Sequence, residues 1–467
     1  MKTRTFVLAA AAAAVVAAGT AFMLLDSPPG PEQPREQARA PAPVERPALE
    51  PAPAAPIRYD VEYPFMAYRT TPRADAVANL VKRIEAGDAE LALDGPRGLL
   101  DSLLAALDID PASQVLVFSA TSLQTGSIRP RTPRAIYFND DVYVAWVQGG
   151  GPIEIASMDP QLGPVFYTLD HEADADFVTH TERCLRCHDS LSLTGGGVPR
   201  FIVGSGYIGT DGSIVTHEGW ILTSQRTPLR SRFGGWYVTG HHGEQVHLGN
   251  IVVRNVYALS DLDALRIGNI ESLDGIVDTS QYAAPGSDIV ALLVMQHQID
   301  VQNEISRVNY KVRAALERSA DAANGAPGPD AAVVAELVEP LVETLLFAGE
   351  ARLESPISGS STFRATFEAR GPVDDAGRSL RELALDGRLM RYPLSYQIYS
   401  AAFDALPAVA KAQVYRRLRE ILGGEDASET FAHLSAEDRT AILEILTATK
   451  PDFAAVADAT GTPPDGA

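Results

Sequence analysis

The hydrophobic pattern changes from strand-like to helix-like near residue 285, and this change limits the fold more than any other feature of the chain. Before it, short apolar runs rich in β-branched and aromatic residues alternate with turns, which is typical of strands. After it, apolar residues recur at helical spacing, with the longest pattern running to about residue 320 behind Ser287 as the expected N-cap. This order predicts an α+β fold with a β-rich region over 57–285 and a mainly helical region over 286–451. The clearest strand signals cover residues 114–119, 135–138, 142–147, 153–156 and 165–167.

The two ends of the chain differ from this body. Residues 1–25 begin with Lys2 and Arg4 and continue as an uncharged, Ala-rich stretch, which is the pattern of a secretory signal peptide. If it is not cleaved, the stretch is long enough to anchor the chain in a membrane. Residues 26–56 contain ten prolines and predict a semi-rigid linker, and residues 452–467 are expected to be a disordered tail. The body is therefore predicted to be periplasmic or otherwise extracytoplasmic, tethered to the inner membrane if the anchor is retained.

The charge balance restricts the partners. The chain has 39 basic and 60 acidic residues, giving a formal net charge of −21. Such a surface disfavours nucleic acid, whose phosphates need clustered Lys and Arg, and it favours a basic partner protein.

Both cysteines of the chain lie in one pentapeptide, Cys184-Leu-Arg-Cys187-His188. The CxxCH pattern is the c-type haem attachment motif. Two thiols separated by two residues can each add to one haem vinyl group, and the adjacent histidine then reaches the iron as proximal axial ligand. The motif predicts one covalent haem c, bound through Cys184 and Cys187 and ligated by His188.

Three other roles for the cysteines stay open at this point. A structural zinc site would need further ligands from scattered residues. A thioredoxin-like dithiol expects a strand before it and a helix after it, a pattern that residues 181–183 and 189–197 fit poorly. A disulfide across two intervening residues would close a very small loop and stabilise little.

The pentapeptide resembles that of the c-type cytochromes. The resemblance implies thioether bonds at Cys184 and Cys187 and iron ligation by His188. The motif lies in the middle of this chain, whereas in small soluble cytochromes c it lies near the mature amino terminus. Segments 131–144 and 391–399 are similar to large exported monohaem cytochrome-like proteins, a class that implies no mechanism.

The sixth iron ligand would decide the chemistry, since two strong axial ligands favour electron transfer and an open position favours small-molecule binding. His297 is one candidate for the distal ligand or pocket, because it shares the apolar stripe of the long predicted helix with Leu293 and Val301. The alternative is a buried histidine that is hydrogen-bonded to its neighbours.

His242 and His247 are the other distal candidates, on a Gly-rich stretch that also contains His241. Three imidazoles within seven residues could offer an axial ligand, hydrogen-bond donors or part of a second metal site. A polar surface loop explains them equally well.

Three functions follow in order of preference. The first is an exported monohaem c-type cytochrome that transfers electrons to or from a basic redox partner. The second is a haem-dependent peroxidase, oxidase or oxygenase with an open distal site, which the size of the body motivates. The third is a haem-based sensor. The sequence therefore leaves enzymatic activity open.

Overall fold

The structure is a computed structural model that describes residues 64–172, 176–254, 268–321 and 329–460. These residues belong to one unit, Ile57–Ala467. The predicted signal or anchor over 1–25 and the linker over 26–56 lie outside the described residues.

A six-stranded antiparallel sheet forms the amino-terminal half, and its spatial order follows the chain from β1 to β6. Strands β2 to β5 follow one another through residues 139–141, 148–152 and 160–162, short connections that are typical of antiparallel neighbours. At one of them the Asn139 side chain accepts hydrogen bonds from the backbone N–H groups of Asp141 and Val142 and closes the turn between β2 and β3. The strands are β1 (Val115–Val117), β2 (Arg134–Phe138), β3 (Val142–Val147), β4 (Ile153–Asp159), β5 (Gly163–Leu169) and β6 (Phe177–Thr179).

Both faces of the sheet are covered. Every residue of β3 and of β5 is buried, which a sheet with one solvated face does not show. On one face, Val144 and its neighbours pack with the residues of α1 (Ala76–Glu85) and α2 (Leu100–Ala106). On the other face, Tyr143 and its neighbours belong to the core that includes the long helix α5.

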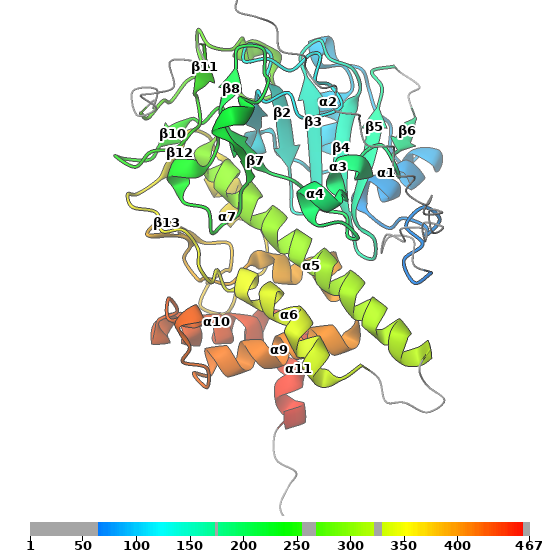
Figure 1. Cartoon of the computed structure of the whole chain (residues 1–467), viewed down its shortest axis with the longest axis vertical. Coiled ribbons are helices and arrows are strands. Elements are labelled where there is room, and N and C mark those ends of the chain that lie inside the picture. Colours follow the sequence, from blue (N-terminus) through cyan, green and yellow to red (C-terminus); the bar gives the residue numbers. More distant parts are fainter. Residues whose placement is uncertain (1–63, 173–175, 255–267, 322–328, 461–467) are drawn as a thin grey trace, which may run out of the picture. The chain divides into compact units, whose positions relative to one another are not determined.

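Helix α5 (Ile289–Asp321) runs between the sheet and the carboxyl-terminal helices (Figure 1). Its N-cap is Asp288, whose carboxylate accepts from the N–H groups of Val290 and Ala291. Ser287, the expected cap, instead donates to the carbonyl of Tyr237 and accepts from the N–H of Leu116, so that it joins the helix start to β1.

The carboxyl-terminal half is mainly helical, so the predicted α+β class is confirmed. The larger helices are α6 (Ala331–Leu345), α9 (Ala408–Leu422), α10 (Ala436–Thr449) and α11 (Pro451–Thr460). Helix α11 occupies part of the segment expected as a tail, because Phe453 is fully buried and packs edge-on against Tyr415 at 5.4 Å. Among the described residues, none of the helices has the length and apolar character needed to cross a membrane.

The remaining α-helices and β-strands are short. They are α3 (Leu185–His188), α4 (Leu191–Thr194), β7 (Gly204–Gly206), β8 (Ile208–Gly209), β9 (Trp220–Leu222), β10 (Gly240–His241), β11 (Val252–Val253), β12 (Ser358–Gly359), α7 (Phe363–Glu368), β13 (Leu383–Asp386), β14 (Arg388–Met390) and α8 (Ala401–Asp404).

Candidate functional site

The CxxCH pentapeptide forms a single helical turn. The backbone N–H groups of Cys187 and His188 both donate to the carbonyl of Cys184, at 3.1 and 3.0 Å. Residues three and four positions apart lie on the same face of a helix, so this turn brings both thiols and the imidazole to one side. Cys184 is half-buried, Cys187 is exposed, and both are free thiols.

One ring nitrogen of His188 is hydrogen-bonded to the backbone, and the other is left for a ligand. Its Nδ1 lies 2.7 Å from the carbonyl oxygen of Arg200, which can only accept, so Nδ1 carries the proton. Burial lowers the pKa of His188 to about 4 and keeps the ring neutral. A backbone carbonyl on the far nitrogen is how ligating histidines are usually oriented, with Nε2 left for the metal. The Phe166 ring lies against this imidazole, 4.4 Å between centroids, and limits its rotation.

The motif turn borders a cavity of about 530 Å³, and Cys184, Cys187 and His188 all line it. This volume is in the usual range for cofactor and ligand sites. The register of the sheet explains which side chains form the floor of the cavity. Tyr143 on β3 pairs with Ala156 on β4, and Ala156 pairs with Phe166 on β5. Directly paired residues point to the same face of a sheet. The floor of the cavity is therefore a largely apolar patch of three neighbouring strands.

Helix α5 lines the cavity with Met295 and Ile299, one turn apart. Met295 is 1% exposed, so its thioether is held among core side chains. Thioether sulfur is a known axial ligand of haem iron in cytochromes c. Met295 was not among the distal candidates indicated by the sequence, whereas His297, two residues further along the same helix, was.

The cavity also has a polar end, which Arg134 and Glu154 both line. Arg134 lines it and forms an ion pair of 3.3 Å with Glu154, whose carboxylate also accepts from Ser122 and Gln124. The Nε of Arg134 is buried and has no hydrogen-bond partner in the structure. A buried guanidinium nitrogen without a partner is costly, and a haem propionate would supply the missing acceptor. The thiols, the free nitrogen of His188, the apolar floor and this arginine together fit a haem.

His297 does not line this cavity. Its Nδ1 lies 2.6 Å from Gln225 Oε1 and its Nε2 lies 2.8 Å from Ser395 Oγ, so both nitrogens have partners. The ring stacks on Phe347 with centroids 4.0 Å apart, and burial lowers its pKa to about 3. His297 thus has the surroundings of a buried, hydrogen-bonded histidine, which is the alternative to a role as distal ligand.

His242 and His247 are also placed away from the cavity lining. Their rings contact each other with centroids 4.5 Å apart, and both are buried. The Nδ1 of His242 lies 2.5 Å from the carbonyl of Gln245, whereas the Nδ1 of His247 accepts from the N–H of Gly249. These contacts put the protons on different nitrogens of the two rings. His241 is exposed and pairs with Glu271 at 2.6 Å.

Comparisons with known proteins add no further constraint. The chain matches no protein-family model, no curated protein and no solved structure. Across the described part of the chain, His, Cys, Asp and Glu side chains do not gather in groups of three or more that could hold a metal ion.

Proposed function

We propose that this protein is an exported monohaem c-type cytochrome that transfers electrons. Cys184 and Cys187 would hold the haem covalently, His188 would ligate the iron, and Arg134 would meet a propionate. Bound haem would supply a one-electron iron centre. The observation that supports this proposal most directly is that all three residues of the motif line one cavity whose floor is apolar.

Met295 favours electron transfer over chemistry at an open iron. Its side chain lines the same cavity as His188 and is buried. A histidine and a methionine as axial ligands leave no position for oxygen or peroxide and raise the reduction potential. Met295, which lines the cavity, would therefore hold the iron together with His188, whereas His297, His242 and His247 do not line it.

The haem assignment is tested with protein exported from a host that has haem-attachment machinery. A pyridine haemochrome assay is expected to give a c-type chromogen at one haem per chain. Cys184→Ala combined with Cys187→Ala is expected to abolish covalent haem on a denaturing gel. Arg186→Ala is the matched control, because Arg186 occupies an exposed position of the motif that makes no bond to haem. Wild-type protein without covalent haem would overturn the proposal.

The axial assignment is tested by Met295→Leu, which keeps volume and removes the sulfur. The wild-type spectrum is expected to be low-spin and insensitive to carbon monoxide. Met295→Leu is expected to become high-spin and to bind carbon monoxide, whereas Met158→Leu, a second buried methionine that does not line the cavity, should not change the spectrum. Carbon monoxide binding by the wild type would favour the haem enzyme instead.

The basic partner expected from the net charge would dock away from the motif turn. Arg183 and Arg186 are both exposed there, so the surface next to the thiols is locally basic. Carboxylates elsewhere on the chain would have to attract such a partner.

A further inference from the structure

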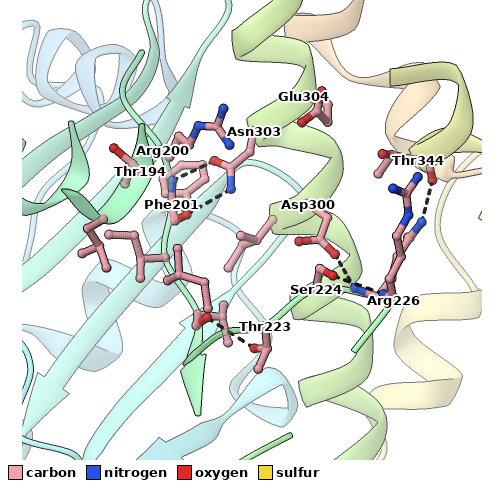
Figure 2. Close-up of a pocket in the computed structure, with 16 residues that line it drawn as sticks. Thr194, Arg200, Phe201, Thr223, Ser224, Arg226, Asp300, Asn303, Glu304 and Thr344 are labelled. Atoms are coloured by element: carbon pink, nitrogen blue, oxygen red, sulfur yellow. Dashed lines mark hydrogen bonds between the residues drawn. The ribbon is translucent and has the colours of Figure 1, made fainter. Parts of the chain in front are cut away.

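A second, polar cavity lies next to the proposed haem cavity. This cleft of about 300 Å³ shares five lining residues with its neighbour: Leu193, Phe201, Ile202, Val203 and Ile299. Figure 2 shows that its other lining residues bring charged and polar side chains from α5 and from the segment after β9. An apolar wall facing a few convergent polar groups is the usual composition of a small-molecule site.

Most of the charges in the cleft are neutralised by partners. Arg226 forms a 2.8 Å ion pair with Glu343 and also donates to the carbonyl of Ala348. Glu304 pairs with Arg307 at 2.5 Å. These two pairs leave little net charge for a ligand to meet.

Arg200 is the exception. Its Nε is buried and without a hydrogen-bond partner, and the structure gives its guanidinium no ion pair among the described residues. Its backbone carbonyl is the acceptor that holds Nδ1 of His188. Arginine in a concave, partly buried site typically binds carboxylate or phosphate through two parallel hydrogen bonds.

Asp300 cancels this charge only in part. One of its oxygens accepts from the N–H of Gln225 at 2.5 Å. Burial raises the pKa of Asp300 to about 7 and Glu304 adds to the rise, while Arg232 and Arg226 oppose it. Near neutral pH the carboxyl is therefore partly protonated, and in that form it can donate a hydrogen bond to an anion.

We propose that Arg200 binds a carboxylate in this cleft, with the apolar part of the ligand against Leu193 and Ile202. The carboxylate can come from two sources. One is a propionate of the haem itself, since the two cavities adjoin, and this source rests on the proposed function. The other is a free monocarboxylate, which does not depend on haem.

The test is calorimetric titration of benzoate into two full-length proteins, the holoprotein and the Cys184→Ala, Cys187→Ala chain. Benzamide, which has the same shape without the charge, is the ligand control. Arg200→Gln is expected to raise the Kd for benzoate at least about tenfold, the equivalent of one charge-assisted hydrogen bond. Arg226→Gln, on the same cleft but paired with Glu343, is expected to stay within about threefold.

The two sources give different results. A free carboxylate site binds benzoate in both proteins, and binding depends on Arg200. A propionate site binds benzoate only in the chain without cysteines, and Arg200→Gln then lowers the reduction potential of the holoprotein while Arg226→Gln does not. Binding that is absent or independent of Arg200, with an unchanged potential, overturns the inference. Wild-type protein without haem that still binds benzoate through Arg200 overturns the proposed function and leaves this inference intact.

Discussion

The proposed haem cavity and the polar cleft share a wall but differ in chemistry, and helix α5 makes the difference. Met295 lines the cavity alone, Ile299 borders both, and Asp300, Asn303 and Glu304 line the cleft alone. Successive residues of a helix are rotated by about 100°, so Met295 and Asp300, five positions apart, lie on different sides of it. One buried helix thus serves two sites, and the residues on each side determine which kind of ligand fits.

The largest effect on the free energy of unfolding is expected from removing the hydrogen bonds that hold the polar cleft together. Arg232 is buried and donates to the carbonyls of Gln225 and Thr227 and to Oε1 of Gln296, and so holds the segment that lines the cleft. Arg232→Met would leave three acceptors without a donor and is expected to cost about 3–5 kcal/mol in the free energy of unfolding. Urea denaturation measures it.

The exposed Arg230 provides the matched control for that change. Arg230→Met should stay within about 0.5 kcal/mol of the wild type, as most surface substitutions do. Equal losses in the two variants would show that the buried hydrogen bonds of Arg232 do not stabilise the cleft.

A smaller effect is expected at the boundary of the two sites. The Asn303 side chain accepts from the N–H of Phe201 at 2.8 Å and donates to its carbonyl at 3.0 Å. Asn303→Leu removes both bonds from a largely buried backbone and is expected to cost about 2–4 kcal/mol by the same measurement. The same change at the exposed Asn79 on α1 should be nearly neutral, and a neutral result at Asn303 would contradict this role.

The smallest effect is a pH dependence at His297. Burial lowers its folded pKa to about 3, below the unfolded value of about 6.5, so the unfolded chain binds more protons as pH falls through this window. Stability therefore decreases from pH 6.5 downward, and His297→Gln should reduce that slope by up to about 1.4 kcal/mol per pH unit.

Buried carboxyl groups change the pH dependence of stability in the opposite direction. The contribution of His297 is therefore measured as the difference between the variant and the wild type. Burial raises the pKa of Asp141 to about 6 and that of Glu350 to about 7, so these groups lower stability as pH rises. They are present in both proteins and cancel when His297→Gln is compared with the wild type. His217→Gln, at an exposed site, should keep the wild-type slope.

The fold was largely predictable because its signals are local. The first five strands of the sheet and helix α9 match apolar runs with clear turns or caps, and the Gly-Gly pair after Leu422 marks the end of α9. Residues 201–203 form an apolar run that is typical of a strand. In the structure this segment belongs to no strand, and the N–H of Phe201 bonds to the side chain of Asn303 rather than to a neighbouring strand.

The candidate site was predictable only in part. The motif itself marks Cys184, Cys187 and His188, because the spacing carries the chemistry. The sequence could not show whether Met295 or His297 lines the cavity. Residues 289–299 of α5 are all buried, so the polarity of their side chains does not indicate which side of the helix faces the cavity. The sequence also did not indicate Arg134 and Arg200 as site residues, because their surroundings depend on contacts between segments far apart in the chain.

The two hydrogen bonds between Asn303 and Phe201 join residues 102 positions apart, and this spacing has a consequence for biogenesis. In a chain that is exported amino terminus first, as proposed, the motif turn emerges well before α5. The thiols would then lie on a segment whose cavity still lacks the wall formed by α5, and an attachment enzyme could reach them. Arrival of α5 would then add Met295 and Ile299 to the cavity wall, so under the proposed function haem attachment would precede completion of the cavity.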